Sequence, residues 1–310
     1  MGSPTACLQP SQSARVVVER LRLAFVGPRV WLDGCAPPAP TRSFALGRFT
    51  SEAGSGEHDE RALDEMRAFV PHACFVFDPG SLSTALMEQL PGRTLGILVT
   101  GDAAAAQADA EGAAQRLAPL DRLVSFAPAL TGATIGGKRV WRAMPAPVSD
   151  LFYRPVGALR SPVRGIAVGR STRHREHMLL PAKHHHDLLQ VLHGVSGGAL
   201  AELLEGCDVG VHVAAQGEHG YGQQVGLHLA AGQLLLSEPI VPAHGLEVDI
   251  DYLRFDSPEG LVWMLDRLGS FPQMHQRVRV RGRMKAEQYR ASRVFTRLAH
   301  DLLADVAAFG

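Results

Sequence analysis

The chain has 310 residues, enough for two domains of roughly 150 residues each. Apolar residues make up 46% of it and charged residues 20%, and 31 lysines and arginines balance 31 aspartates and glutamates. This neutral balance gives no general argument for a nucleic-acid partner or an anionic membrane surface.

The cysteines and the N-terminal residues indicate the compartment. Cys7, Cys35, Cys74 and Cys207 are far apart and form no CxxC pair, so reduced thiols are expected. The first residues lack the apolar core of a secretory signal. No apolar run reaches the length of about 18 residues that a membrane-spanning helix needs. We therefore expect a cytoplasmic protein without a membrane span, with a flexible tail over residues 1–19.

Residues 20–144 repeat a strand–loop–helix pattern. Short apolar runs predict strands, and apolar residues at helical spacing predict the helices between them. Ser81 or Ser83 is expected to cap the helix that ends near residue 90. The segment 27–42, which is rich in proline and glycine, is expected to form loops. The predicted strands cover 21–26, 74–77, 94–99, 122–126 and 140–144, and the predicted helices cover 57–69, 81–90 and 103–117.

The pattern stops at residues 145–162, where proline and glycine interrupt it, and then restarts. We place a domain boundary in this segment. Ser257 is expected to cap the helix that follows it, with Pro258 in the first turn. The predicted strands of the second half cover 164–168, 188–191, 209–213, 233–237 and 252–255, and its helices cover 199–204, 223–231, 257–268, 272–289 and 292–308.

Apolar strands that alternate with helices indicate parallel sheets covered on both faces. The predicted fold class is therefore α/β, with two Rossmann-like, doubly wound halves. In such sheets ligands bind at the carboxyl ends of the strands. Four loops of the second half fall there: 169–176, 193–198, 214–224 and 238–247.

The first of these loops is rich in arginine. The stretch from Lys138 to Lys183 holds ten lysines and arginines against two acidic residues, which suggests a focused anion site. Arg170, Arg173 and Arg175 could donate paired hydrogen bonds to phosphate oxygens. The alternative is a solvated basic turn.

The third loop combines glycines with a carboxylate. Gly217, Gly220 and Gly222 allow backbone amides to converge before a helix N-terminus, an arrangement that binds anions. Glu218 could hold sugar hydroxyls, and Glu238 in the fourth loop could accept a hydroxyl as well. The alternatives are a flexible surface turn and a solvent-facing carboxylate.

No metal site is predicted. Adjacent helical residues point about 100° apart, so the triple His184-His185-His186 cannot easily share one ion. No DxD-type acidic pair follows a strand. The chain also has no GKS or GKT phosphate loop and no GxSxG elbow.

The run CDVGVHVAAQGEHGYGQQVGLHLAAGQLLLSE, residues 207–238, resembles the donor-binding segment of GT-B glycosyltransferases. It is most similar to the bacterial group called CgeB-like or "glycosyl transferases group 1". The turn at residues 230–232, the stretch DYLRFDSPEGLVWMLDRL and the arginine-rich C-terminal stretch resemble the same group. The resemblance covers about residues 145–310 and is only architectural before that.

The resemblance implies two Rossmann-like domains that face each other across a cleft. Residues 20–150 would form the acceptor domain and residues 151–290 the donor domain, and a helix over 291–310 would cross back to the first domain. A nucleoside-diphosphate sugar would bind as substrate, and no cofactor is implied. Gly169, Arg170 and Lys183 would lie near the diphosphate, and residues 218–222 near the sugar.

One position departs from the family. Retaining members carry a second glutamate where this chain has Leu227, so the donor ribose would be contacted by Gln223, Gln224 or His228 instead. Among first-half residues, Trp31 could stack on the acceptor, and Asp33 or Asp102 could act as the base. The expected catalytic residues are Glu218 and Asp102; the expected donor-binding residues are Gly169, Arg170, Ser171, Thr172, Arg173, Lys183, His193, Gly194, His219, Gly220, Tyr221, Gly222, Gln223, Gln224 and His228.

The sequence therefore predicts a metal-independent glycosyltransferase of the hexosyltransferase type. It would move a sugar from a nucleoside-diphosphate donor to a small-molecule, glycan or protein acceptor. The alternative is a non-catalytic GT-B-like module that binds a nucleotide or a protein. A Rossmann dehydrogenase fits poorly, because the loop after the first strand reads GPRVWLDG and not GxGxxG.

Overall fold

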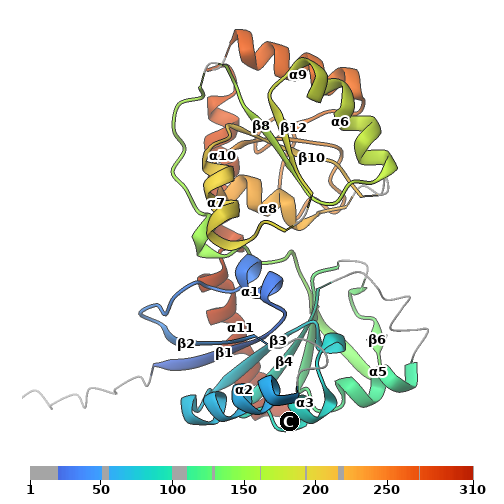
Figure 1. Cartoon of the computed structure of the whole chain (residues 1–310). Helices are drawn as coiled ribbons and strands as arrows, with labels where there is room; N and C mark the ends of the chain where they lie inside the picture. Colours follow the sequence, from blue (N-terminus) through green and yellow to red (C-terminus); the bar gives the residue numbers. More distant parts are fainter. Residues whose placement is uncertain are drawn as a thin grey trace, which may run out of the picture.

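The computed structural model describes residues 20–50, 56–99, 110–127, 130–160, 162–192, 194–215, 220–271 and 273–309. Two sheets, one above the other in Figure 1, divide it into two halves. Helices cover both faces of each sheet. Across the described residues no helix is long and apolar enough to cross a lipid bilayer.

The sheet of the first half has the strand order β2-β1-β3-β4-β5-β7-β6. All neighbours pair in parallel except the short hairpin between β6 and β7. Fully buried runs such as ACFVF in β3 make its centre. The strands are β1 (Leu21–Gly27), β2 (Phe44–Thr50), β3 (Ala73–Phe77), β4 (Arg93–Leu98), β5 (Arg122–Ser125), β6 (Thr134–Ile135) and β7 (Lys138–Ala143); the helices are α1 (Arg29–Cys35), α2 (Gly56–Phe69), η1 (Pro79–Ser81), α3 (Thr84–Glu88) and α5 (Ala110–Leu117).

The sheet of the second half is parallel throughout, in the order β12-β11-β10-β8-β9. Its central strands β10 and β11 are buried at every residue. The strands are β8 (Gly165–Val168), β9 (Leu188–Val191), β10 (Val209–His212), β11 (Leu234–Ser237) and β12 (Leu253–Arg254); the helices are η3 (Asp150–Phe152), α6 (Arg173–His185), α7 (Gly197–Glu205), α8 (Gln223–Ala230), α9 (Pro258–Ser270), α10 (Gln276–Ala286), η4 (Glu287–Tyr289) and α11 (Ala291–Phe309).

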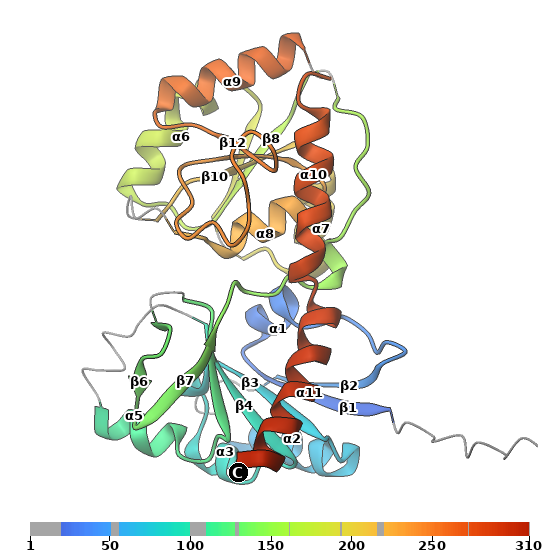
Figure 2. The same cartoon turned by 180° about the vertical axis from the view of Figure 1, so that it is seen from behind.

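The last helix, α11, leaves the second half and packs on the first sheet (Figure 2). Its Phe295 is fully buried against the rings of Phe25, Phe75 and Phe77, at centroid distances of 5.0, 4.9 and 5.9 Å. Two ion pairs fix the same helix to the sheet, between Arg122 and Asp305 and between Arg142 and Asp301. The first half therefore contains residues from both ends of the described chain.

The loop predicted over residues 27–42 contains a helix, and a strand that was not predicted follows it. Residues 29–35 form the helix α1, because Leu32 and Cys35 are buried against the first sheet despite the proline-rich segment that follows. Residues 44–50 form the edge strand β2, which pairs with the whole of β1. Its glycine and arginine interrupt the apolar alternation that would have marked a strand.

Both predicted helix caps are confirmed. The Ser83 hydroxyl accepts a hydrogen bond from the amide of Leu86 at 3.2 Å, and the Ser257 hydroxyl accepts one from Gly260 at 3.1 Å. Each cap satisfies one of the free N–H groups at the start of its helix.

Candidate functional site

The candidate site lies where the second sheet changes direction. The chain passes from β8 to its neighbour β9 on one side and returns to β10 on the other, so the crevice between β8 and β10 is the topological switch point. The loops after β8 and β10 meet there, and α8 begins at the end of the second loop. Figure 1 shows α7 and α8 on the side of the second half that faces α1.

Gly169 and Arg175 form the centre of this crevice. Arg175 is buried, and its guanidinium donates to the carbonyls of Val213 at 2.9 Å and Arg170 at 2.8 Å. Gly169 has a φ of +131°, and a Cβ atom there would lie 2.5 Å from the Arg175 Nη1. The chain needs glycine at this position because the guanidinium lies directly over its backbone.

The start of α8 completes the crevice. A Cβ atom on Gly222 would lie 2.9 Å from the His212 Nε2, so the helix approaches β10 as closely as a glycine allows. Gln224 faces back across the crevice, with its side-chain nitrogen 3.3 Å from a Cβ on Gly169. The structure thus brings together Gly169 from one loop that the sequence singled out with Gly222 and Gln224 from another.

His212 is a site residue that the sequence analysis missed. Its Nδ1 lies 3.0 Å from the Ser237 hydroxyl, which donates its own proton to the Glu238 carbonyl at 2.7 Å. Nδ1 therefore carries the ring proton, and Nε2 is left as an acceptor beside Gly222. Burial lowers the pKa of His212 to about 3, so the ring is neutral. His212 lies in the apolar strand β10, and the sequence pointed to the loops after the strands instead.

Glu238, the candidate hydroxyl acceptor after β11, is already partnered. One carboxylate oxygen lies 2.8 Å from the His174 Nε2, and the other accepts the Ala214 amide at 2.8 Å. The side chain is buried and ties the loops after β8, β10 and β11 to one another. Glu238 therefore positions the crevice. Burial lowers the pKa of the Arg175 guanidinium, and the nearby negative charge of Glu238 opposes this effect.

The Lys183 ammonium is paired within the protein. The residue is on α6, more than two turns from the helix start, and its ammonium pairs with Glu176 at 3.1 Å. The Ser171 hydroxyl donates to the same carboxylate, and the Gln190 amide reaches it at 3.3 Å. These contacts lower the pKa of Glu176, the Ser171 bond most strongly. Ser171 and Lys183 thus brace the first turns of α6.

Arg170 and Arg173 have exposed side chains beside the crevice. Thr172 caps α6 by accepting the Arg175 amide at 3.2 Å, and the helix begins at Arg173. A pocket of about 440 Å³ opens at this helix start, lined by Thr172, Arg173, His174, His177 and Ala215. Arg173 therefore lines a pocket at the carboxyl edge of the sheet.

His228 corrects the expectation of a ribose contact. It is fully buried, in the last turn of α8, and packs over Gly210, where a Cβ atom would lie 2.3 Å from its ring. Its Nδ1 donates to the Gln233 Oε1 at 2.7 Å, because the Gln233 amide nitrogen donates to two carbonyls. Leu227, at the position of the family glutamate, is buried as well. Neither side chain offers a polar group to the crevice.

Tyr221 is buried between aromatic neighbours. Its ring lies 5.2 Å from the His244 ring and 5.6 Å from that of Tyr289. Tyr221 and Tyr289 belong to the apolar cluster that holds α8 on its sheet. Tyr221 therefore anchors the loop before α8, and its backbone rather than its ring is available to a ligand.

The first half faces this crevice through α1. The Gln223 side-chain amide reaches the Cys35 sulfur at 3.0 Å, and the Ser196 hydroxyl at the start of α7 lies 3.5 Å from the Asp33 carboxylate. Arg48 pairs with Asp33 at 3.0 Å. Asp33, one of the bases considered from the sequence, is thus held by a cation at the contact between the halves.

Asp78 is a described carboxylate at the switch point of the first sheet. It follows β3, next to β1, where the chain of the first half also changes direction. Its φ of +51° is unusual for a residue other than glycine, and desolvation raises its pKa. The sequence did not single out Asp78, because its backbone conformation and its burial are tertiary properties.

Four predicted residues, Glu218, Asp102, His193 and His219, lie outside the described residues. Of the remaining loop glycines, Gly194 is exposed before α7, and Gly220 lies two residues before the α8 cap. Within the described part of the chain, no group of three histidine, cysteine or acidic side chains is arranged to hold a metal ion.

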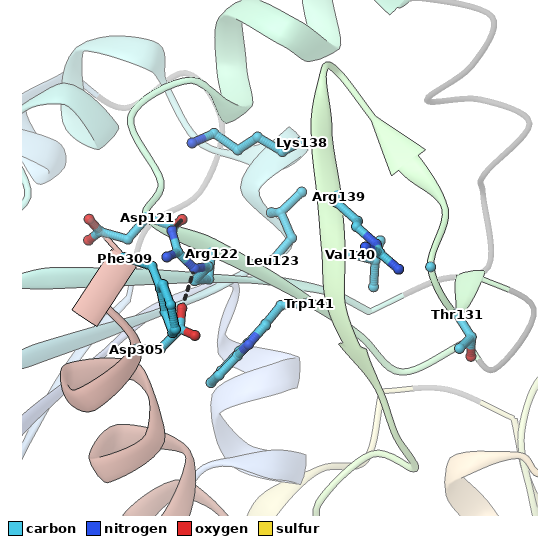
Figure 3. A pocket seen from close by; sticks show the side chains of 11 residues that line it. Asp121, Arg122, Leu123, Thr131, Lys138, Arg139, Val140, Trp141, Asp305 and Phe309 are labelled. Carbon is cyan, nitrogen blue, oxygen red and sulfur yellow. Dashed lines mark hydrogen bonds and ion pairs between the residues drawn. The ribbon is translucent and has the colours of Figure 1, made fainter. Parts of the chain in front are cut away.

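A second cavity, of about 730 Å³, lies at the opposite edge of the first sheet. Figure 3 shows it beside the starts of β5 and β7, between Trp141 and Phe309. Two of its cations are engaged by the protein, since Arg122 pairs with Asp305 at 2.6 Å and the Lys138 ammonium donates to the Leu120 carbonyl. Because it lies at the amino ends of the strands, it is not part of the crevice.

Two buried neutral histidines predict a loss of stability in mild acid. Burial lowers the pKa of His212 to about 3 and that of His228 to about 4, both below the value of about 6.5 in the unfolded chain. Below pH 6.5 the unfolded chain binds these protons and the folded protein does not. Between pH 6.5 and 5 each histidine should therefore remove about 2 kcal/mol from the free energy of unfolding.

Urea denaturation at pH 7 and at pH 5 measures this effect. The variant H212N, which keeps a polar group near Ser237 but does not titrate, should lose about half of the pH dependence. An unchanged pH dependence in H212N would show that His212 is not buried in its neutral form.

Comparison with known proteins shows the fold. No protein-family model matches the chain, and no curated protein sequence does. Solved structures do match along most of the chain. Sucrose-phosphate synthase from Thermosynechococcus elongatus matches with a TM-score of 0.56 and 12% identity, over 94% of this chain and 100% of its own. HepE from Anabaena, solved in complex with UDP-glucose, matches with a TM-score of 0.57 and 8% identity, over 92% of this chain and 100% of its own.

A third match is a glycosyltransferase from Rickettsia africae, with a TM-score of 0.53 and 9% identity, over 92% of this chain and 99% of its own. These structures share the two-sheet α/β architecture, and the chain has the GT-B fold. The fold class predicted from the sequence is confirmed. At such low identities the matches carry the fold and not the individual site residues.

Proposed function

We propose that the protein is a glycosyltransferase that uses a nucleoside-diphosphate sugar and transfers the sugar to an acceptor hydroxyl. The observation that carries this is the crevice between β8 and β10, where Gly169, Arg175 and Gln224 meet the glycine-capped start of α8. The matched HepE structures hold UDP and UDP-glucose, which agrees with a nucleotide donor. The proposal includes that the transfer needs no metal ion and that the protein is cytoplasmic.

The crevice supplies what the leaving group needs. In transfer, the acceptor oxygen bonds to the anomeric carbon, the bond from that carbon to the diphosphate oxygen breaks, and its electrons leave with the diphosphate. Fixed donors stabilise that developing charge without reorganising. Arg170 and Arg173 would pair with the phosphate oxygens, and the amides at the start of α8 would add the positive end of the helix dipole. Arg175 holds the loop carbonyls that position these groups.

The proton of the acceptor hydroxyl needs a base from the first half. Asp78 fits that role, since its raised pKa and its place at the switch point of the first sheet are both typical of a general base. Glu218 would orient the sugar, and Asp102 is the competing base. A comparison of D78N with D102N separates the two, because only the true base should lose most of kcat while UDP affinity is kept.

One observation favours the alternative of binding without transfer. Leu227 and His228 are both buried, so no described side chain on this face of α8 replaces the family glutamate. If the protein only binds nucleotides, UDP should stabilise it while UDP-glucose is neither hydrolysed nor transferred over a broad panel of acceptors.

Nucleotide binding is the first test of the proposed function. We expect UDP, or another diphosphate from a panel with GDP, ADP and CDP, to raise the melting temperature. The double variant R170Q/R173Q should weaken that binding at least about tenfold, since a charge-assisted hydrogen bond contributes about 1.5–3 kcal/mol. R277Q, which removes an exposed arginine from α10, is the control and should bind as the parent does. Failure of every diphosphate to bind would refute the proposal.

A further inference from the structure

A separate cavity lies where the two chain connections between the halves run side by side. Figure 2 shows the segment after β7 passing next to the junction of η4 and α11, and the two segments pair through Val148 and Arg290. The cavity has a volume of about 680 Å³. Met144 and Pro145 of the first half line it, together with His244, Tyr289 and the first turns of α11.

This junction cavity carries an excess of positive charge. Arg293 and Arg297 both line it, one turn apart on α11. Like charges at this spacing repel each other, and an anion between them would relieve the repulsion. The carboxylate that lines the cavity is Glu287, which is shared with two further arginines: Arg283 at 2.8 Å and Arg290 at 2.7 Å.

Arg283 and Arg290 therefore largely balance the charge of Glu287. Arg293 is a third and more distant partner of this carboxylate, at 3.3 Å. Hydrogen bonds from Arg290 and Arg283 hold the pKa of Glu287 at about 2, so it stays ionised. Arg297 is exposed and makes no hydrogen bond or ion pair with any residue in the described ranges. The Arg297 guanidinium is thus available to bind an anion, and the Arg293 guanidinium is only weakly paired.

Most of the remaining wall residues are apolar or aromatic, and His244 is the imidazole among them. Val294 and Tyr289 are buried, and Met144 and Pro145 continue the apolar surface. Gln288 adds a neutral hydrogen-bonding group. A ligand that fills this space would pack a carbon framework against the apolar walls and present an acidic group to Arg297 and Arg293.

We infer that the junction cavity binds the acidic group of the acceptor, a carboxylate or a phosphate, so that the preferred acceptors are organic anions. That the bound anion is an acceptor rests on the proposed function. The binding site itself stands on the cavity, its two arginines and its apolar walls.

Three sugars that differ in charge test it: glucose, glucuronate and glucose 6-phosphate. Their binding is measured by calorimetry with saturating UDP, which keeps the anions out of the β8–β10 crevice. The protein should bind at least one anionic sugar about tenfold or more tightly than glucose, as expected for paired guanidinium–anion hydrogen bonds. Glucuronate as the tighter ligand identifies a carboxylate site, and glucose 6-phosphate identifies a phosphate site.

The double variant R293Q/R297Q should lose that preference and still bind UDP as the parent does. R277Q is the matched control and should keep the preference. Equal affinity for the three sugars, no binding of either anion, or a preference that survives in R293Q/R297Q would overturn the inference. Failure of the proposed function would show separately, as no UDP binding or no transfer to any acceptor.

Discussion

Replacing Phe295 by alanine should lower the free energy of unfolding of the first half by about 3–5 kcal/mol. The ring is fully buried and lies between three phenylalanines of β1 and β3, at centroid distances of 4.9 to 5.9 Å. Truncation removes these edge-to-face contacts and leaves a cavity that the strands cannot close. α11 would then be held to the sheet mainly by its remaining apolar residues and by two ion pairs at its surface.

Urea denaturation followed by tryptophan fluorescence measures this effect. Trp31 and Trp141 belong to the first half, and Trp263 to the second, so W263F as background makes the signal specific. F309A is the matched control, because Phe309 lies on the same helix with 81% of its surface exposed. A loss of less than 1 kcal/mol in F295A would mean that α11 does not complete the first core.

The substitution G169A should abolish most nucleotide binding. Gly169 has a φ of +131°, which strains any other residue, and a Cβ atom there would lie 2.5 Å from Nη1 of Arg175 and 3.3 Å from the Gln224 amide. The guanidinium would have to leave the carbonyls of Val213 and Arg170. We expect UDP affinity to fall by about 100-fold, and the free energy of unfolding by about 1–3 kcal/mol.

Calorimetric titration with UDP gives the affinity, and thermal unfolding without ligand gives the stability. G157A is the control, since a Cβ atom on Gly157 would meet nothing within 4 Å. Parental UDP affinity in a folded G169A would place the diphosphate elsewhere than between β8 and β10. A loss of affinity in G157A would point to a general effect of added side chains instead.

The fold was predictable because its strands are short apolar runs. Segments such as CFVF in β3 and QLLLS at β11 indicate buried parallel strands without any knowledge of the partner strands. The caps at Ser83 and Ser257 are local signals as well. The edge strand β2 was not predictable, because only two of its seven residues are buried and its pairing with β1 is a tertiary property.

The location of the site was predictable from the sequence, but the roles of most of its side chains were not. The switch-point rule selected the loops that meet in the crevice, and glycines at positions 169 and 222 marked the close approaches. The roles of the arginines and histidines depend on how deeply each side chain is buried, and the sequence alone does not show this. Arg175 proved to be buried and Arg170 exposed, and His228 packs over Gly210 rather than facing a ligand.

The return of α11 to the first sheet has a consequence for how the chain folds during synthesis. The core around Phe25 and Phe75 lacks its covering helix until residues 291–309 have left the ribosome, although both strands emerge early. The second half, whose sheet uses only residues 165–254, can complete its strand pairing before α11 emerges. Contacts that join residues 25 and 295 raise the contact order and slow the last step. The N-terminal half should therefore be the part that depends on chaperones while the chain is still being made.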